Sequence, residues 1–291
     1  MNTVFLKLIS RFTFFALIPT FTFSSVAFSG AFADTFTLPF EVTQPFYVVV
    51  PEKQVLQELA QAPAIPLASG ISILVWNTQK GEGKENWAWD FRNLAKGKQL
   101  VFLQEGMNDN FMPSILRSMP DLGWLMAQNF YMKDSQDATG VITGHTQSPL
   151  STVFKRTKDT EPITNTPKMT LFTTYVMEKG TRILVVNIHG INFTSLFPFY
   201  HQIDQVTELI KKWHGKVIFA GDFNTWAPGR TEYLSRKAQE AGLIEVAVNS
   251  TRSLVLDHIF VRGCYPYRAE IHDEINSSDH KPLTADLVCP E

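Results

Sequence analysis

Six short apolar segments follow one another after Gly70, and they limit most of what this chain can fold into. Each is rich in aliphatic residues and bounded by polar or turn-forming residues, which is typical of strands buried on both faces of a sheet. Segments with helical periodicity separate some of them, and this alternation predicts a layered α/β domain. The six segments are SILVW (72–76), LVFLQ (100–104), RILVVNI (182–188), KVIFA (216–220), DHIFV (257–261) and TADLV (284–288).

Two helices are predicted between these strands. Residues 200–214 place apolar side chains on one helical face, and Gly215 ends the pattern. A second helix is expected after Thr231, with Gly242 as its stop. The interval 128–168 is polar and rich in turn-forming residues, so we expect surface loops there. The predicted inward-facing residues are Ile203, Val206, Leu209, Ile210 and Trp213 in the first helix, and Leu234, Ala238 and Ala241 in the second.

The N-terminal residues have the composition of a secretory signal peptide. Lys7 and Arg11 precede an apolar run over 12–28, and the sequence AFA at 31–33 is typical of a cleavage site before Asp34. An uncleaved membrane anchor is the alternative, but a proline and several hydroxyl residues interrupt the run, which is short for a bilayer span. We therefore expect a secreted or periplasmic protein.

Composition also suggests the domain boundaries. The signal peptide covers 1–33. Residues 34–69 are punctuated by prolines, and we interpret them as an N-terminal extension packed on the domain and then a linker. The α/β domain covers 70–291, which is long enough to form its own core. No other apolar run is long enough to span a membrane, and we expect a monomer.

Two cysteines, Cys264 and Cys289, lie near the ends of strand-like segments that could be neighbours. In an exported protein an even number of cysteines indicates a disulfide, and two buried free thiols are the alternative. Neither residue has a nearby base that would make it a nucleophile.

Polar residues of catalytic types stand at the ends of the predicted strands. The segment KVIFAGDFNTW places Asp222 and Asn224 directly after a buried strand. Ligands of open α/β sheets bind beyond the carboxyl ends of the strands, although Gly, Asp and Asn are also ordinary turn formers. Any one of these polar residues could belong to an ordinary turn, so the prediction of a site depends on the whole set of polar residues at the strand ends. Its other members are Asn77, Glu105, His189, Asp257 and the pair Asp279 and His280.

Six motifs occur in a characteristic order: WNTQ at 76–79, LQE at 103–105, NIHGIN at 187–192, GDFN at 221–224, LDHIF at 256–260 and SDH at 278–280. Over 70–288 this order resembles the endonuclease/exonuclease/phosphatase superfamily, which includes pancreatic-type DNases, abasic-site endonucleases, neutral sphingomyelinases and inositol polyphosphate phosphatases. The resemblance implies a DNase I-like, four-layer α/β sandwich. In this fold helices flank two facing mixed β-sheets, and the site lies at the strand ends along one edge.

The resemblance also implies metal-assisted hydrolysis of a phosphoester by in-line attack of water. Glu105 matches the principal metal ligand, with Asn77 beside it and Asp279 near the metal. Oxygen ligands of this kind bind Mg²⁺, with Mn²⁺ or Ca²⁺ as alternatives. Asp222 matches the residue that takes a proton from the water, and Asn224 matches the one that hydrogen-bonds the water or a phosphate oxygen.

Two imidazoles flank the phosphate in this family. His189 and His280 are the matched pair, which would donate to non-bridging oxygens as charge develops. Asp257 matches the carboxylate that fixes the tautomer of His280 and favours its charged form. Asn192 stands where some relatives contact phosphate.

Other polar residues receive different interpretations. Asn187 is predicted to be a structural amide, and His258 points to the opposite face of its strand from the neighbouring aspartate. The acidic partner that the family provides for His189 is not marked, and Asp134 and Asp137 are the candidates. Histidines without a motif are predicted to lie on the surface: His145, His201, His214 and His272.

The charge of the chain limits how it could hold a polyanion. Its 26 Lys and Arg and 28 Asp and Glu give a net charge of −2, and loss of the signal peptide makes it more negative. Nucleic acid must then be held by a local basic patch or by metal ions. Lys155 and Arg156, with Lys158 and Lys168, are the candidate patch, or else a solvated loop face.

We therefore expect an exported phosphodiesterase of DNase-like endonuclease type, with DNA as substrate and no stable protein partner. His189 is the DNase-like residue at a position where some relatives carry Tyr. The alternative within the enzyme class is a sphingomyelinase-type lipid phosphodiesterase, for which SLFPFY at 195–200 could form an apolar lip. A non-catalytic binding protein on this scaffold is disfavoured by the intact catalytic set.

Overall fold

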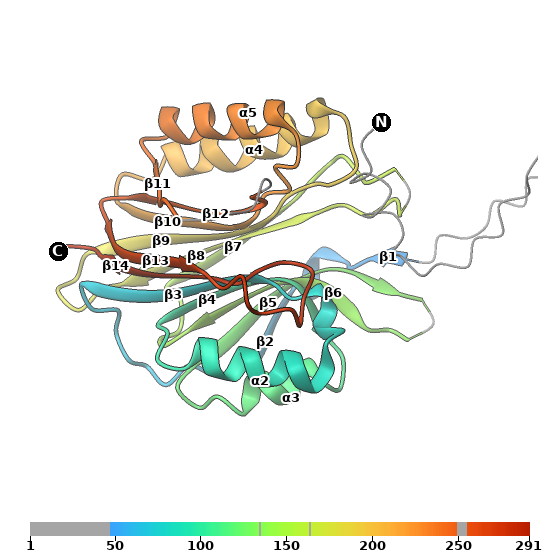
Figure 1. The fold of residues 1–291 in the computed structure, drawn as a ribbon, viewed down its shortest axis with the longest axis horizontal. Helices are drawn as coiled ribbons and strands as arrows, with labels where there is room; N and C mark the ends of the chain where they lie inside the picture. The colour runs from blue at the N-terminus through green and yellow to red at the C-terminus, as the bar shows by residue number, and fades with distance from the viewer. Residues whose placement is uncertain (1–46, 134, 163, 249–254) are drawn as a thin grey trace, which may run out of the picture. The chain divides into compact units, whose positions relative to one another are not determined.

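Two mixed β-sheets face each other, and helices cover the outer face of each (Figure 1). The computed structural model describes residues 47–133, 135–162, 164–248 and 255–291. These belong to one compact unit, Gln44–Glu291. The predicted signal peptide, 1–33, lies outside the described residues. This architecture is the four-layer α/β sandwich that the sequence motifs predict.

The first sheet has the order β1-β5-β6-β4-β3-β14-β13, and β2 also pairs with β5. Only β3 and β4 are parallel in it, because α2 crosses over between them. Its strands are β1 (Tyr47–Val49), β2 (Leu56–Ala60), β3 (Gly70–Asn77), β4 (Leu100–Asn108), β5 (Gly123–Met132), β6 (Ala138–His145), β13 (Tyr265–Ile271) and β14 (Leu283–Val288).

The second sheet has the order β11-β12-β10-β9-β8-β7. Its parallel pair is β9 and β10, connected by α4. The two sheets thus each contain a strand-helix-strand unit whose strands end at the same edge. The strands are β7 (Ser151–Arg156), β8 (Met169–Val176), β9 (Arg182–His189), β10 (Lys216–Asp222), β11 (Ile244–Glu245) and β12 (Asp257–Arg262).

Helices cover both outer faces. The helices α2 (Lys84–Ala95) and α3 (Met112–Arg117) pack on the first sheet, and α4 (Leu196–Lys211) and α5 (Pro228–Glu240) pack on the second. The 3-10 helices are η1 (Glu52–Gln54) and η2 (Gln79–Gly81). None of the helices in the described ranges combines the length and hydropathy that a bilayer span requires.

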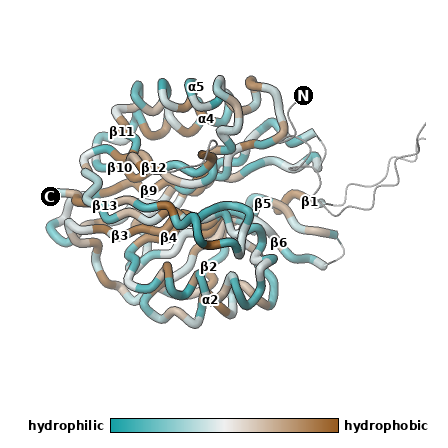
Figure 2. The backbone as a smooth tube through the Cα atoms, viewed as in Figure 1, coloured by the Kyte–Doolittle hydropathy of each residue, from teal (hydrophilic) through white to brown (hydrophobic). Residues whose placement is uncertain are grey.

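The strands are apolar on both faces because each sheet packs against helices on one face and against the other sheet on the other face. In β10, Ile218 and Ala220 enter the core between the sheets, whereas Val217 and Phe219 pack under the helices. Figure 2 shows hydrophobic segments concentrated in the strands and alternating with hydrophilic ones along the helices. All six predicted strands are present, each within one or two residues of the apolar segment except β4, which continues to Asn108.

The surface loops predicted over 128–168 are wrong for nearly half of that interval, which contains the end of β5, all of β6 and all of β7. β6 is buried throughout although it reads ATGVITGH. Space explains its composition: a Cβ on Gly140 would lie 2.0 Å from the Ala127 carbonyl oxygen, and one on Gly144 would lie 2.4 Å from the Trp124 ring. His145, expected on the surface, is buried at its end.

Other boundaries differ as well. α4 begins at Leu196 and α5 at Pro228, each a few residues before the predicted start, and Pro228 suits a first helical position. Part of the segment interpreted as an extension supplies β1 and β2, which pair with β5. Cys264 and Cys289 form a disulfide that joins β13 to β14, so the alternative of two free thiols is wrong.

Candidate active site

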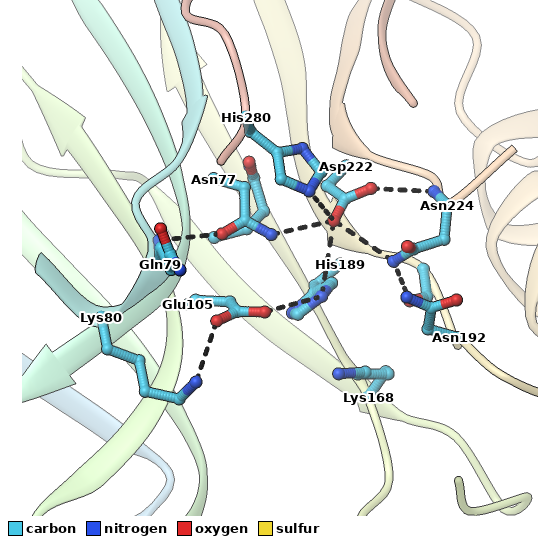
Figure 3. Close-up of polar contacts among 12 residues, drawn as sticks. Asn77, Gln79, Lys80, Glu105, Lys168, His189, Asn192, Asp222, Asn224 and His280 are labelled. Atoms are coloured by element: carbon cyan, nitrogen blue, oxygen red, sulfur yellow. Dashed lines mark hydrogen bonds and ion pairs between the residues drawn. The ribbon is translucent and has the colours of Figure 1, made fainter. Parts of the chain in front are cut away.

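Side chains from both sheets meet at the edge where β3, β9 and β10 end and β12 begins. Parallel register places His189 beside Asp222, and antiparallel register places Asp257 on its other side. From the first sheet, Asn77 ends β3 and Glu105 lies in β4. Figure 3 shows most of these side chains pointing toward one another.

Asp222 lies at the centre of the cluster and is 1% exposed. Its Oδ2 accepts hydrogen bonds from Asn77 Nδ2 at 2.9 Å and from Asn224 Nδ2 at 3.2 Å. Its Oδ1 accepts from the Asn224 backbone N–H at 2.8 Å. Burial raises the pKa of Asp222 to about 6; His280 opposes this shift and Asp257 adds to it. A carboxylate with this pKa can accept a proton near neutral pH.

Two imidazoles face the same carboxylate oxygen. His280 Nε2 is 3.8 Å and His189 Nε2 is 3.6 Å from Asp222 Oδ2. His280 Nδ1 lies 2.8 Å from Asp257 Oδ2, which fixes Nδ1 as the protonated nitrogen that faces this carboxylate.

The two imidazoles differ in charge. Burial lowers the pKa of His280, but the carboxylates of Asp257 and Asp222 outweigh burial and raise it to about 10. Burial and then the Lys168 ammonium lower the pKa of His189, against the attraction of Glu105. Near pH 7 the site therefore holds one imidazolium and one neutral imidazole.

A β-bulge in β4 aims Glu105 into the site. The register with β6 shifts between Leu103 and Gly106, and Glu105 has a φ of 52°. Its Oε2 lies 3.1 Å from Lys80 Nζ, and its Oε1 lies 3.9 Å from His189 Nε2. Burial would raise the pKa of Glu105, but these groups and Lys168 lower it, so the group is a carboxylate.

The preceding residue, Gln104, points into the molecule and contacts the other sheet. Its Nε2 donates to Asn187 Oδ1 at 2.7 Å, and Asn187 Nδ2 donates to the Ile142 carbonyl oxygen at 3.0 Å. Asn187 is fully buried, as expected of a structural amide. This polar pair joins the two sheets directly beneath the site.

Close backbone packing supports the loops after β9 and β10. A Cβ on Gly190 would lie 2.5 Å from the Phe223 carbonyl oxygen, and one on Gly221, with a φ of 145°, would lie 2.0 Å from the Ile188 carbonyl oxygen. Asn224 has a φ of 53°, and its Nδ2 donates to the Gly190 carbonyl oxygen at 2.9 Å. Glycine is required where backbones approach this closely.

Arg230, from α5, fixes the same loops from below and is completely buried. Its guanidinium donates to the carbonyl oxygens of Ile191 at 2.6 Å, Thr194 at 3.0 Å and Asn224 at 3.2 Å. The rings of Phe199 and Trp226 lie on it at 4.8 and 4.6 Å. No motif marked this residue in the sequence.

Two lysines of the site were also missed by sequence reasoning. Lys80 follows the WNTQ motif, and nothing in the sequence indicated that it would turn back to Glu105. Lys168 was assigned only to the basic patch; it is buried and lies 3.1 Å from Glu161 Oε1. That oxygen also accepts the Asn192 backbone N–H at 3.0 Å, so Glu161 connects Lys168 to the loop after β9.

The remaining predicted residues are placed less centrally. Asn192 lies beside Asn224 (Figure 3), and its Oδ1 accepts from Trp226 Nε1 at 2.9 Å, so Trp226 orients Asn192. Asp279 is exposed; its backbone N–H donates to Gln79 Oε1 at 3.0 Å, and its carboxylate helps to raise the pKa of His280.

Most residues of the basic patch lie away from the central cluster. Arg156 Nη2 donates to the Val50 carbonyl oxygen at 2.8 Å, which ties β7 to the first sheet. Lys155 lies on β7 opposite Thr170, and Lys158 is exposed. The structure does not join these residues to the central cluster by any contact among the described residues.

The candidate partners of His189 are also different from those expected. Asp137 is in the β5–β6 turn, with its backbone N–H bonded to Ser135 Oγ at 3.2 Å, and Asp134 lies outside the described residues. Among the residues that the structure describes, Glu105 and Asp222 are the acidic groups that lie near His189. His258 points away, as expected, and bonds Glu245.

The donor set fits a divalent metal ion. Glu105 supplies a carboxylate and Asn77 an amide oxygen, which suit a hard cation such as Mg²⁺. In addition, Asp222, Asp257 and His280 each offer a ligand atom, and these atoms lie within 4.8 Å of one another.

Known proteins resemble this chain in sequence and in fold. Residues 74–280 match the model of the Endonuclease/Exonuclease/phosphatase family. A UPF0294 protein of Vibrio cholerae is 30% identical over 266 residues, covering 87% of this chain and 91% of that protein. A family protein from Bacteroides thetaiotaomicron has a TM-score of 0.59 at 14% identity, covering 78% of this chain and all of that one. The human Nocturnin catalytic domain with bound sulfate has a TM-score of 0.55 at 16% identity, covering 77% and 96%. The chain therefore belongs to the endonuclease/exonuclease/phosphatase family.

Proposed function

We propose that the protein is an exported, divalent-metal-dependent phosphodiester hydrolase that acts as a DNase-like endonuclease. The observation that carries this proposal is the convergence of one acid-base set from two sheets. Glu105 and His280 come from the first sheet or its loops, and His189, Asp222 and Asp257 come from the second. A carboxylate of raised pKa between a charged and a neutral imidazole is typical of a site of acid-base catalysis.

Asp222 is the proposed general base. Its raised pKa is close to neutral, so its carboxylate can take a proton from a water molecule aligned with the phosphate. Asn77 and Asn224 donate to it and hold its orientation.

His280 is the proposed source of positive charge at the phosphate. Its Nδ1 is held by Asp257, so its Nε2–H can donate to a non-bridging oxygen as negative charge develops. His189 would donate from the other side as a neutral imidazole. Lys168 adds a fixed charge close to His189.

Glu105 and Asn77 would hold the metal ion. When bound, a divalent ion neutralises the phosphate and stabilises the leaving oxygen. The carboxylate form of Glu105, which its cationic neighbours maintain, is the form that binds a metal. Mg²⁺ is the proposed ion, with Mn²⁺ or Ca²⁺ as alternatives.

Export supports DNA as the substrate, because nucleic acid is an abundant phosphodiester outside the cytoplasm. The mature protein should begin at Asp34 when isolated from periplasm or medium, and a chain beginning at Met1 would contradict export. Lys155 and Lys158 are the remaining candidates for a backbone grip. Replacing both by Met should weaken cleavage of all sequences equally and make the salt dependence shallower.

A lipid phosphodiesterase is the second candidate, and one observation favours it. Directly after Asn192, the apolar side chains of Phe193, Leu196 and Phe197 are exposed, with Phe197 at 71%. Apolar groups beside a site could enter a membrane surface. Replacing Leu196 and Phe197 by Ser should then reduce cleavage of sphingomyelin in vesicles but not of a soluble diester.

The decisive experiment is a substrate panel. Purified mature protein is assayed on plasmid DNA, RNA, sphingomyelin and bis(p-nitrophenyl) phosphate, with Mg²⁺ or with EDTA. Nicking of plasmid DNA that requires Mg²⁺ is the expected result. His280→Ala and Asp222→Ala should abolish it while circular dichroism remains unchanged. Full activity in either variant would overturn the mechanism, and no turnover on any substrate would favour a binding protein.

A further inference from the structure

Lys80 holds the carboxylate that the metal would need. Its Nζ lies beside Glu105 Oε2 (Figure 3), at 3.1 Å, and its side chain is 31% exposed. An ammonium and a divalent ion cannot both approach one carboxylate oxygen without repelling each other. The protein therefore holds a positive charge of its own against the carboxylate that is proposed to bind the cation.

The loop around Lys80 is built to keep it there. Gln79 has a φ of 45°, Lys80 of 55° and Gly81 of 69°, which is a left-handed conformation that non-glycine residues rarely adopt. The Gln79 backbone N–H donates to Asn77 Oδ1 at 3.1 Å, and the Asp279 N–H donates to Gln79 Oε1 at 3.0 Å. Residues of the site thus fix the loop on both sides.

We propose that Lys80 competes with the divalent ion for Glu105 and, once displaced, contacts the phosphate of the substrate, so that metal binding and phosphodiester binding strengthen each other. The proposal rests on the proposed function, because it requires a metal at Glu105. Two cations near one carboxylate repel, and an added phosphate attracts both. By linkage, each ligand then raises the affinity for the other by the same factor.

A purely structural ion pair would behave differently. If Lys80 only held Glu105 in place, Lys80→Met would leave metal affinity unchanged or weaken it. If Lys80 competes, the same substitution frees the carboxylate and tightens metal binding. The sign of the change in metal affinity therefore separates the two roles without any measurement of turnover.

The test is isothermal titration calorimetry of Mn²⁺ into the mature protein, with and without a saturating phosphorothioate-linked thymidine dinucleotide. Lys80→Met should bind Mn²⁺ more tightly than the wild type by roughly threefold to tenfold. The dinucleotide should tighten Mn²⁺ binding by at least about fivefold in the wild type and clearly less in the variant.

Two matched variants control this result. Lys84 is the first residue of α2, four residues after Lys80, and its Nζ lies over the Phe111 ring at 5.1 Å, so Lys84→Met should behave like the wild type. Lys80→Arg keeps the charge and should keep the weaker Mn²⁺ affinity. Equal or weaker Mn²⁺ binding by a folded Lys80→Met would overturn the proposal. Absence of Mn²⁺ binding by the wild type would instead overturn the proposed metal-dependent function, and this inference with it.

Discussion

Replacing Arg230 should destabilise the protein and its catalytic loops together. In Arg230→Met, the carbonyl oxygens of Ile191, Thr194 and Asn224 and the Thr194 hydroxyl lose their donor in a buried region. Each lost bond costs about 1 kcal/mol, and the stacking between two aromatic rings contributes about 1 kcal/mol more. Removing a desolvated cation offsets part of this loss. We expect the free energy of unfolding to fall by about 3 to 5 kcal/mol.

Urea denaturation followed by circular dichroism measures this change. Arg236→Met is the matched control, because Arg236 lies on the same helix, contacts the Tyr233 ring and Glu240, and is exposed. The control should lose no more than about 0.5 kcal/mol. Arg230→Lys keeps the charge but reaches fewer acceptors, so its stability should lie between the two. An Arg230→Met protein as stable as the control would refute the argument that this arginine holds the loops.

Three further outcomes are expected. Asp257→Asn should leave His280 without its carboxylate and lower kcat by roughly 10²- to 10⁴-fold, measured by plasmid nicking, with a normal kcat arguing against the pair. His145 is 3% exposed, and burial lowers its pKa from 6.5 to about 4, so its neutral form is favoured in the fold. The contribution of His145 to stability should be complete above pH 6.5 and fall by about 3 kcal/mol between pH 6.5 and 4, and urea titrations of His145→Phe should show stability falling less than in the wild type over this range. Gly221→Ala should give insoluble or unfolded protein, because its Cβ would strike the Ile188 carbonyl; soluble, stable protein would contradict that clash.

The predictable part of the fold is the part in which hydrophobicity decides burial. β9 and β10 lie between a helical layer and the other sheet, so both faces are apolar and the segments stand out in the sequence. β6 is equally buried, but the space available to it is set by Ala127 and Trp124, and glycine fills that space. A strand that needs small side chains, such as β6, lacks the run of large apolar residues by which a buried strand is predicted from the sequence.

The residues of the candidate site also include some that the sequence predicts and some that it does not. Asp222 and His280 were predictable because each stands in a motif at a strand end. Lys80 and Arg230 reach the site through backbone turns and packing that depend on the completed fold. Single lysines and arginines in polar segments resemble solvated residues, and only three-dimensional proximity distinguishes these two.

The link between Gln104 and Asn187 has a mechanical consequence. Because the proposed metal ligands and the proposed general base belong to different sheets, their separation depends on how far one sheet slides along the other. Apolar side chains between sheets resist separation but tolerate small lateral shifts, whereas a directional hydrogen bond does not. Two further hydrogen bonds cross between the sheets within the site, Asn77 to Asp222 and His280 to Asp257, and they have the same directional character. Together these hydrogen bonds fix the lateral position of one sheet relative to the other. The geometry of the candidate site therefore depends on the interface between the two sheets as much as on any loop.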